Sequence, residues 1–371
     1  MLALEPNAQP DAEAVERMCA AMLHRGPDDH GLRVDGPCAL GHRRLSIIDL
    51  RPEGAQPMTN EDDSISLVVN GEIYNFAELR RELEAKGHRF KSRSDSEVIL
   101  HLYEETGVDF VDQLRGMFAL ALWDGRRRRL VLARDRFGKK PLFYHVGARG
   151  LVFASEIGAL VASAQFDRRP DLDAIDAFLC LQYVPSPWTA FEGVRKLPAG
   201  CRLVCESGTI GEPEHYFELQ FDRRTAGSPA ELQEQLHTHI EDAVRVRMIS
   251  DVPLGAFLSG GIDSSVVVAV MSELSDRPVK TFSIGFEEQG FSELHYAKDV
   301  ARRYATDHTE FIVKPEMADV LPKLAWHYGE PFADASALPT YYVSRETRKH
   351  VTVALNGDGG DENFAGYDRY R

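Results

Sequence analysis

The sequence contains few cysteines, and none of them stand in a recognised pairing pattern. The five are Cys19, Cys38, Cys180, Cys201 and Cys205, with no C-x-x-C pair among them. An odd number of scattered cysteines in a long chain favours reduced thiols over a disulfide framework or a cysteine-based zinc site.

Long apolar runs are also missing. Runs such as Met117–Trp123 (MFALALW) fall far short of the roughly twenty residues that a membrane-spanning helix needs. Polar residues interrupt the first dozen positions, where the apolar part of a signal peptide would lie. We therefore expect a cytoplasmic protein without a membrane partner. Its 371 residues, of which 43% are hydrophobic, suffice for two or three globular domains.

Positive charge is scarce. The chain has 43 Lys and Arg against 58 Asp and Glu, a formal net charge of -15, which would repel a polyanion and argues against a nucleic-acid partner. The one basic run is Arg126–Arg129 (RRRR), which lies between Trp-Asp-Gly and a strand-like segment. This position is typical of a solvated hairpin turn.

Short apolar runs separated by turn residues fill the chain from about Leu40 to Ala162, and this spacing predicts packed antiparallel sheets. Two stretches with apolar residues three and four apart, 77–87 and 96–107, predict helices. The predicted strands are 65–71, 118–125, 129–135, 141–147 and 151–157.

After 222–230 the pattern changes to alternating strands and helices, which predicts a parallel sheet covered on both faces. We place the boundary near residue 225, with domains at 1–220 and 231–371 and a linker at 221–230. The predicted strands are 252–258, 279–286, 308–313 and 351–357, and the predicted helices are 231–248, 264–274 and 292–305.

The loop Ser259–Ser265 (SGGIDSS) follows the first of these strands and leads into a helix that we expect to begin near Asp263 or Ser264. Ligands bind at the carboxyl ends of parallel strands. Glycines let the backbone approach a guest, and free N–H groups and serine hydroxyls donate to an anion. The loop has no Walker A lysine and no G-x-G-x-x-G pattern. It suggests a pyrophosphate cradle in which Asp263 holds Mg²⁺; an ordinary strand-to-helix turn with serine caps is the alternative.

A second glycine loop follows the strand at 351–357. It mixes three glycines with three carboxylates, namely Gly357, Gly359, Gly360, Asp358, Asp361 and Glu362. Carboxylates gathered at an anionic site must be bridged by a metal ion or face a cationic group, because they would otherwise repel phosphates. A solvated acidic loop is the alternative.

A group of polar residues in the first half suits a pocket for glutamine. Arg44 would clamp an α-carboxylate, and Glu72 and Asp95 would receive an α-ammonium. The side chain of Asn70 and the N–H of Gly71 would form an oxyanion hole for amide hydrolysis. Taken singly, Arg44 or Asp95 is more typical of an ordinary salt bridge.

Motifs in both halves make the chain resemble a known family. S-G-G-x-D-S-S after an apolar strand is the signature of ATP pyrophosphatases, and with the second glycine loop it resembles the synthetase half of glutamine-dependent asparagine synthetases. Six further motifs resemble the glutaminase domain of that family: HRGPDDHG (24–31), GHRRLSIIDL (41–50), VVNGEIYNF (68–76), SDSEVIL (94–100), GMFALALWD (116–124) and RDRFGKKPLFY (134–144).

The resemblance implies an α+β first domain of the N-terminal-nucleophile type, with antiparallel sheets layered as αββα, followed by an α/β ATP-pyrophosphatase domain that is incomplete at its C-terminus. It implies ATP and Mg²⁺ as cofactors, small-molecule substrates (glutamine, ATP and aspartate or a similar carboxylate) and a possible homodimer. The implied glutamine-binding residues are Arg44, Leu45, Ser46, Ile47, Ile48, Asn70, Gly71, Glu72 and Asp95. The implied ATP-binding residues are Leu258, Ser259, Gly260, Gly261, Asp263, Ser264, Ser265, Ile284, Asn356 and Gly357. Asp358, Gly359, Asp361 and Glu362 would contact aspartate or its aspartyl-AMP, with Asn70, Gly71 and Asp358 in catalytic roles.

The sequence departs from the family at both ends. The family's nucleophile is an N-terminal cysteine whose own α-amine, with a pKa near about 8, acts as the base. This chain begins with Met1, and we expect about five or six residues, starting with that cysteine, to precede it. Cys19 lies in a helical pattern and Cys38 is internal, so both are expected to be core thiols. Relatives continue well beyond Arg371, with a further metal-binding carboxylate and a lysine.

The acceptor stays open at this point. Asn356 and Asp358 stand where many relatives carry serine and glutamate, and the shorter carboxylate leaves the choice of substrate undecided. One alternative is a related amidotransferase that acts on a carboxylate of a secondary metabolite or a polysaccharide precursor. Another is a non-catalytic protein that binds glutamine or nucleotide.

Overall fold

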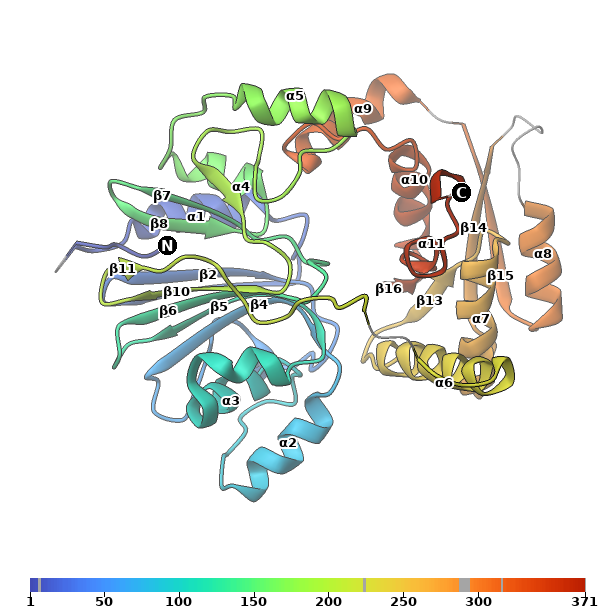
Figure 1. The fold of residues 1–371 in the computed structure, drawn as a ribbon, viewed down its shortest axis with the longest axis horizontal. Coiled ribbons are helices and arrows are strands. Elements are labelled where there is room, and N and C mark those ends of the chain that lie inside the picture. Colours follow the sequence, from blue (N-terminus) through green and yellow to red (C-terminus); the bar gives the residue numbers. More distant parts are fainter. Residues whose placement is uncertain (6–7, 223–224, 287–293, 315, 371) are drawn as a thin grey trace. The chain divides into compact units, whose positions relative to one another are not determined.

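The computed structural model describes residues 1–5, 8–222, 225–286, 294–314 and 316–370. They form two compact units (Figure 1). The first contains Met1–Phe221 and Pro322–Ala333, and the second contains Asp222–Leu321 and Asp334–Arg371. Each unit is described by itself below.

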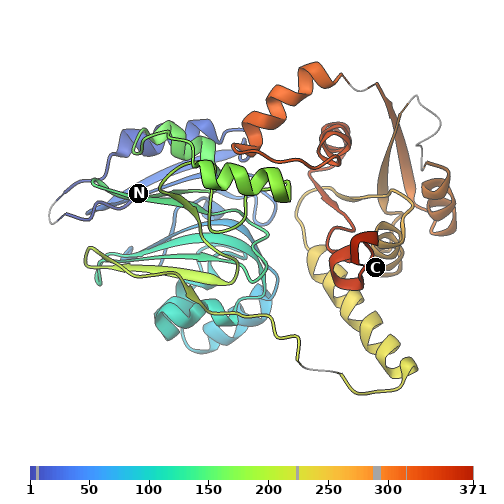
Figure 2. The same cartoon turned by 45° about the horizontal axis from the view of Figure 1, so that its top comes forward.

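The first unit is layered as helix, sheet, sheet and helix (Figures 1 and 2). Helices α1 (Ala12–Ala21) and α4 (Ile157–Ser163) cover the outer face of one sheet, and α2 (Phe76–Ala85) and α3 (Val98–Thr106) cover the outer face of the other. The first sheet holds β1 (Asp29–Asp35), β2 (Cys38–Arg44), β7 (Phe143–Gly147), β8 (Gly150–Ala154) and β9 (Val194–Lys196). The second, in the order β11-β10-β6-β5-β4-β3 with β12 beside β10, holds β3 (Met58–Thr59), β4 (Ile65–Ile73), β5 (Gly116–Asp124), β6 (Arg129–Arg134), β10 (Cys201–Glu206), β11 (Thr209–Ile210) and β12 (Glu214–His215).

The first residues of the chain join the two parts of the first sheet. Leu2 forms antiparallel bridges to Cys38 on β2 and to Leu151 on β8. Its N–H donates to the Leu151 oxygen at 2.8 Å, and the Leu151 N–H donates back at 2.9 Å. Leu2 therefore occupies the position of a central strand, where it is buried.

Alternation along the strands separates three cores. On β5, Leu120 and Leu122 face α2 and α3, whereas Ala121 and Trp123 face the other sheet, as the two-residue period of a strand requires. A third core lies between α1, α4 and the first sheet. The antiparallel αββα layering implied by the resemblance is thus confirmed.

The predicted hairpin turn at Arg126–Arg129 is present between β5 and β6. Three of its guanidinium groups lie against carboxylates: Arg126 pairs with Asp62, Arg127 with Asp124 and Arg129 with Glu206. One predicted strand was too long. Residues 151–157 were assigned to a single strand, but β8 ends at Ala154 and Ile157 already begins α4.

The second unit contains a parallel sheet with the strand order β15-β14-β13-β16. The strands are β13 (Leu254–Phe257), β14 (Lys280–Phe286), β15 (Asp307–Val313) and β16 (Val353–Leu355). The helices are α6 (Pro229–Arg247), α7 (Ile262–Leu274), α8 (Leu294–Arg303), α10 (Ala337–Thr347) and α11 (Gly360–Phe364). The predicted parallel sheet is confirmed, and α7 begins slightly before the expected Asp263. Residues 292 and 293 of the predicted helix 292–305 lie outside the described residues.

Both faces of this sheet are covered. Gly285 on β14 lies against Leu294 of α8, and a Cβ on Gly285 would come within 2.4 Å of the Leu294 side chain. Phe282, an odd number of residues away and therefore on the opposite face, packs against His350 after α10, with ring centroids 5.6 Å apart. This arrangement is typical of parallel sheets.

The remaining elements are short. The second half of α9 (Met317–Tyr328) belongs to the first unit, where the ammonium of Lys196 lies 2.6 Å from the carboxylate of Glu330.

Among the residues that the structure describes, every helix is too short or too polar to serve as a membrane span. The elements not yet named are α5 (Leu172–Leu181) and the 3-10 turns η1 (Pro52–Gly54), η2 (Gly107–Gln113) and η4 (Asp368–Tyr370).

Candidate functional site

The residues predicted to bind glutamine come from three separate segments of the first unit. These are the end of β2 with the loop after it, the end of β4, and the loop before α3. Two hydrogen bonds tie the segments together. The Asp49 carboxylate accepts from the N–H of Arg93 at 2.6 Å, and the Asp95 carboxylate accepts from the N–H of Ile73 at 2.7 Å. The fold therefore brings Arg44, Glu72 and Asp95 into one region.

Arg44 is buried at the end of β2, with 6% of its surface exposed. Its Nη2 donates to the carbonyl oxygens of Asp49 (2.5 Å) and Ile48 (3.3 Å), and its Nη1 donates to that of Arg51 at 3.4 Å. A guanidinium group has five N–H donors, so these bonds do not exhaust it. Arg44 thus holds the loop that follows it, and its role as a carboxylate clamp stays a prediction.

Asp95 is a buried carboxylate close to the end of β4. Burial raises its pKa, and the hydrogen bonds from Ile73 and Ser94 only partly oppose this effect. A buried carboxylate with a raised pKa gains most from a cationic partner, because the partner restores the interactions lost with water. The environment of Asp95 therefore suits an ammonium group.

Asn70 and Gly71 lie side by side on β4, opposite β5. The Asn70 amide nitrogen is 3.5 Å from the hydroxyl of Ser155. A Cβ on Gly71 would lie 2.0 Å from the carbonyl oxygen of Met117, so that only glycine fits there. Packing against β5 is sufficient to explain this glycine, and the oxyanion hole stays a prediction.

The loop Leu45–Ile48 is half-buried and is anchored at Ser46, whose N–H donates to the Asp28 carboxylate at 2.8 Å. Asp28 belongs to the HRGPDD segment, and its own N–H donates to the Arg44 oxygen at 3.0 Å. Asp28 was missed by the sequence reasoning, although its motif had been noted.

Lys140 was also missed. Burial lowers its pKa, the charge of Arg25 lowers it further, and the charge of Glu72 acts in the opposite direction. Asp135, in the same RDRFGKK motif, holds the loop that leads to Lys140. Its carboxylate accepts from the N–H groups of Phe118, Phe137, Lys139 and Lys140. The motif thus folds a loop that places Lys140 near Glu72.

Neither candidate thiol has the environment of a nucleophile. Burial raises the pKa of Cys19 on α1, and it raises the pKa of Cys38 on β2 to about 12. Reactive cysteines have lowered pKa values and some exposure. The amino group of Met1 is buried as well: it donates to the Ala39 oxygen at 2.7 Å, and burial lowers its pKa to about 6.

In the second unit, the loop Ser259–Ser265 lies at the carboxyl end of β13, as predicted. Gly260 has φ +88°, and a Cβ there would lie 2.5 Å from the backbone of α8. The serine hydroxyls bond within the loop: Ser259 and Ser264 Oγ are 2.9 Å apart, and Ser265 Oγ donates to the Gly261 oxygen at 2.7 Å. These bonds hold the loop in a tight turn at the start of α7.

The strand order explains why the two glycine loops meet. The chain runs from β13 to β14 and β15 on one side and returns to β16 on the other side of β13. The connections thus diverge at the carboxyl ends of the paired strands β13 and β16. Open α/β sheets bind ligands at such points. A Cβ on Gly360 would lie 2.2 Å from the Asp263 carboxyl carbon, and one on Gly357 would lie 2.7 Å from the Ser264 nitrogen.

Three carboxylates gather where the loops meet. Burial raises the pKa of Asp263, and the charges of Asp361 and Glu362 raise it further. Glu362 also accepts from the Tyr367 hydroxyl at 2.8 Å. The repulsion within this group marks a place that a cation would stabilise.

The other predicted positions in the second unit already make contacts within the protein or lie beyond those contacts. The Asn356 amide donates to the Asp358 carboxylate at 2.7 Å, so the short side chain of Asp358 is tied back beside Gly359, which has φ +95°. The main-chain groups of Leu258 are engaged in the sheet: its N–H donates to the Phe282 oxygen at 2.9 Å, and its oxygen accepts from the Ser283 hydroxyl. Ile284 lies on β14 beyond that contact.

Comparison with known proteins agrees with this division. Residues 2–217 match the profile of the glutamine amidotransferase domain family, and residues 235–371 match that of asparagine synthase. The chain is 42% identical over 360 residues to asparagine synthetase [glutamine-hydrolyzing] 1 of Bacillus subtilis, a match that covers 97% of this chain and 56% of that protein. It is 37% identical over 377 residues to putative asparagine synthetase [glutamine-hydrolyzing] 2 of Methanocaldococcus jannaschii, covering 96% of this chain and 72% of that protein.

A solved structure of glutamine phosphoribosylpyrophosphate amidotransferase from B. subtilis matches with a TM-score of 0.43 and 15% identity, over 85% of this chain and 69% of that chain. The present chain spans little more than half the length of the first curated relative. The two profile matches and the identity to the archaeal relative over most of its length show that the chain belongs to the family of glutamine-hydrolysing asparagine synthetases.

Proposed function

We propose that the second unit activates a carboxylate with ATP and that the first unit supplies ammonia from glutamine, with aspartate as the acceptor and asparagine as the product. The observation that carries this proposal is the meeting of the two glycine loops, where Gly357 and Gly360 lie against Ser264 and Asp263. Family membership supports the same assignment. ATP and glutamine are the substrates that these loops and the first-unit pocket would bind.

The proposed activation is an in-line displacement. An oxygen of the acceptor's β-carboxylate attacks the α-phosphorus of ATP, and the bond to the β-phosphate oxygen breaks, so that pyrophosphate leaves. The N–H groups at the start of α7 would donate to the pyrophosphate oxygens. The hydroxyls of Ser259, Ser264 and Ser265 would join them by turning away from the bonds that they make within the loop. Ammonia then attacks the acyl carbon, and AMP leaves with the former carboxylate oxygen.

The residues present fit a magnesium ion. Asp263, Asp361 and Glu362 offer carboxylate oxygens, which are the ligands that Mg²⁺ prefers. Burial and then the charges of Asp361 and Glu362 raise the pKa of Asp263. Asp263 would hold the ion, which when bound neutralises charge on the pyrophosphate. Gly360 keeps the backbone of the second loop close to this carboxylate.

In the first unit, glutamine would be held between Arg44 and the carboxylates of Glu72 and Asp95. The amide carbonyl would lie at Asn70 and Gly71. The N–H of Gly71 and the Asn70 amide would stabilise the oxyanion that forms when a thiolate attacks the amide carbon. Lys140, whose charge lies near Glu72, joins the pocket as a further cationic group.

A second acceptor class is favoured by one contact. The side chain of Asp358 is one methylene shorter than that of a glutamate, and the Asn356 amide donates to its carboxylate. The Asp358 carboxylate therefore extends less far than a glutamate would in the same place. An enzyme that amidates a larger carboxylate, such as a secondary metabolite or a polysaccharide precursor, would use this extra room. A protein that binds glutamine or nucleotide without catalysis is the third hypothesis.

The test uses Asp263→Asn in the longest form of the protein that the gene encodes, with Asp276→Asn, an exposed position after α7, as the matched control. Pyrophosphate release is followed with ATP, Mg²⁺, glutamine or ammonia and a panel of carboxylates. Asp263→Asn should lower acceptor-dependent release at least a hundredfold, while glutamine hydrolysis and the control are unchanged. Equal release by Asp263→Asn and parent would overturn the assignment, and the preferred carboxylate identifies the acceptor.

A further inference from the structure

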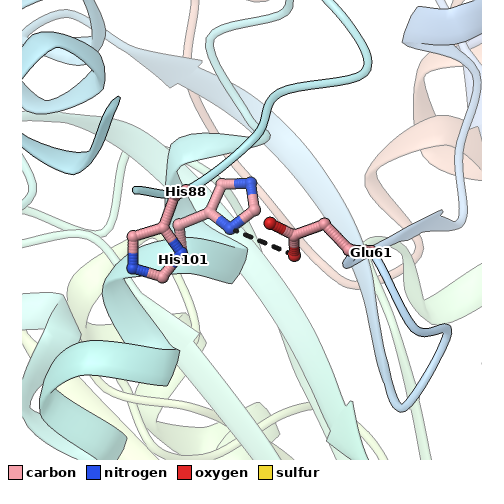
Figure 3. A group of neighbouring side chains, drawn as sticks. All are labelled: Glu61, His88 and His101. Atoms are coloured by element: carbon pink, nitrogen blue, oxygen red, sulfur yellow. Dashed lines mark ion pairs between the residues drawn. The ribbon is translucent and has the colours of Figure 1, made fainter. Parts of the chain in front are cut away.

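A group of histidines and glutamates lies on the α2–α3 side of the first unit. Glu61 comes from the turn between β3 and β4, His88 follows α2, and His101 lies on α3. One ligand atom from each lies within 4.8 Å of the other two. Figure 3 shows the two imidazole rings beside the Glu61 carboxylate, with an ion pair between His101 and Glu61.

The inward atoms have the spacing of metal ligands. His101 Nδ1 is 2.9 Å from Glu104 Oε2 and 3.8 Å from Glu61 Oε2, and His88 Nδ1 is 3.4 Å from Glu104 Oε2. Zinc bonds of about 2.0–2.1 Å to nitrogen and oxygen in a tetrahedron put neighbouring ligand atoms about 3.3 Å apart. The three distances surround this value, so small side-chain movements would bring two nitrogens and two oxygens around one ion.

In three of these residues, the second nitrogen or oxygen of the side chain, which points away from the group, makes a hydrogen bond to another part of the protein. His88 Nε2 lies 3.0 Å from Glu105 Oε1, Glu104 Oε1 accepts from the Asn60 amide at 2.8 Å, and Glu61 Oε1 accepts from the Arg89 N–H at 3.1 Å. A histidine that binds metal through one nitrogen typically donates its other N–H to a carboxylate or a carbonyl. Each ring or carboxylate is therefore fixed on one side and faces the others with its second atom.

His101 completes this pattern. Its side chain is 1% exposed, and its Nε2 lies 4.0 Å from the Glu97 carboxylate. Within the described part of the chain, this nitrogen is buried without a hydrogen-bond partner. A metal ion on Nδ1 would require the proton to be on Nε2, directed toward Glu97. The Glu61 side chain, 39% exposed, leaves the group open to solvent on one side.

The charges favour a cation as well. The carboxylates of Glu61, Glu97 and Glu104 all lie within 4.0 Å of the nearly buried His101 ring. A divalent ion would interact favourably with Glu61 and Glu104 together.

We propose that Glu61, His88, His101 and Glu104 bind one zinc ion, in a site separate from both the glutamine pocket and the nucleotide loops. The ion would join the β3–β4 turn, the segment after α2 and the middle of α3. Four protein ligands would fill the tetrahedral coordination of zinc and leave no position for a bound water, as in structural zinc sites.

The site also connects to the glutamine pocket. The Glu97 carboxylate accepts from the N–H of Ser92 at 2.7 Å, Ser92 Oγ accepts from the N–H of Ser94 at 3.1 Å, and the Ser94 hydroxyl donates to Asp95 at 3.3 Å. A zinc ion that fixes His101 against Glu97 would therefore stiffen the loop that presents Asp95. This consequence rests on the proposed function, whereas zinc binding itself does not.

The experiment titrates the chelator-treated chain with Zn²⁺ by calorimetry, and with Co²⁺ as a spectroscopic substitute. The expected result is one equivalent bound, visible bands typical of tetrahedral Co²⁺, and a rise of several degrees in the melting temperature of the first unit with Zn²⁺ in excess. Binding of less than half an equivalent, or octahedral Co²⁺ spectra, would overturn the proposal.

The variants are chosen so that loss of folding is not mistaken for loss of binding. His88→Asn and Glu61→Gln change residues at the open side, and each should weaken Zn²⁺ binding at least tenfold while leaving the metal-free melting temperature within two or so degrees. His30→Asn, an exposed position on β1, is the matched control and should bind like the parent. If His88→Asn also binds zinc like the parent, the ion is elsewhere. Failure of the Asp263 test leaves this result unaffected, because no residue is shared.

Discussion

The proposed glutamine pocket of the first unit and the glycine loops of the second unit differ in how their charged groups are neutralised. In the pocket, the guanidinium of Arg44 is held by three backbone carbonyls, and the Asp95 carboxylate accepts from a backbone N–H. At the loops, burial raises the pKa of Asp263, and the charges of Asp361 and Glu362 raise it further. Backbone carbonyls already stabilise the charge of Arg44, whereas the carboxylates at the loops lie close to one another, and we expect a cation to stabilise them.

This difference has a physical reason. A site for a small zwitterion can be preorganised, because its charges are fixed by backbone groups that folding places anyway. A site for Mg²⁺ and a triphosphate is not neutralised in advance, because its carboxylates repel one another until a cation binds. Removing a charged side chain should therefore weaken glutamine binding in the pocket but reduce the repulsion between carboxylates at the loops.

The largest expected effect concerns the thiol that the proposed glutamine hydrolysis would require. Because the pKa values of Cys19 and Cys38 are both raised by burial, we expect the chain as printed to hydrolyse no glutamine and to resist a diazo-ketone glutamine analogue. A version extended at Met1 with Met-Cys-Gly-Ile-Ala-Gly should release glutamate and become labelled at the added cysteine, after removal of its first methionine.

Glutamate release and mass spectrometry of the labelled peptide provide the readouts. An extended version whose added cysteine is replaced by serine is the control. Labelling of Cys19 or Cys38 would show that the nucleophile has been misidentified, and an inert extended protein would favour the non-catalytic hypothesis.

The next largest expected effect is the loss of glutamine affinity when Arg44 is removed from the proposed pocket. In the extended version, Arg44→Ala should raise the glutamine KM by a factor that corresponds to about 3–5 kcal/mol, because a buried charge pair loses one partner. Ammonia-supported synthesis should be unaffected. Arg43→Ala, which removes a bond from Arg43 Nε to the Gly26 oxygen, is the neighbouring control.

Arg44 also holds the carbonyls of Ile48 and Asp49, so thermal unfolding of the same variants is needed beside the kinetics. A rise in KM without a change in kcat of the ammonia reaction indicates the clamp. Equal loss of both activities, together with a lower melting temperature, would mean that Arg44 serves only to hold the loop.

The smallest effect tests the loops. In the absence of Mg²⁺, Asp263→Asn should stabilise the second unit slightly, by about 0.5 kcal/mol or less, because it removes repulsion between partly exposed carboxylates. A carboxyl group whose folded pKa is raised destabilises the fold above its unfolded pKa, and this penalty is relieved as the pH falls through the folded value.

Urea unfolding at pH 7 of the parent and Asp263→Asn, at low and high salt, would measure this effect. The difference should shrink as salt screens the charges. A destabilised variant would show that Asp263 is a structural partner in the metal-free protein and would remove the contrast between the two regions.

Much of the architecture follows from sequence alone. The alternation on β5 and the strand-helix succession after residue 225 predict the layered antiparallel sheets and the parallel sheet, because burial of apolar side chains imposes a period of two on strands and a longer one on helices. Ser259–Ser265 could be located at a strand end for the same reason. The errors were local: the segment 151–157 has no breaker where β8 ends and α4 begins.

Other features depend on contacts between segments far apart in the chain. Leu2 becomes a central strand only because β2 and β8 lie on both sides of it. Lys140 lies near Glu72 because Asp135 accepts from three N–H groups of its own loop and from the N–H of Phe118 on β5. Glu61, His88 and His101 share no motif, and they meet because α2 and α3 pack on the same face of the second sheet.

The sequence by itself thus determined the residue types, their order along each strand and the loops in which glycine is required. Only the tertiary structure decided which charges face one another. Periodicity reports burial, which each residue experiences locally, whereas a pKa or a ligand set depends on distances between atoms that the chain brings together only when the sheets and helices pack.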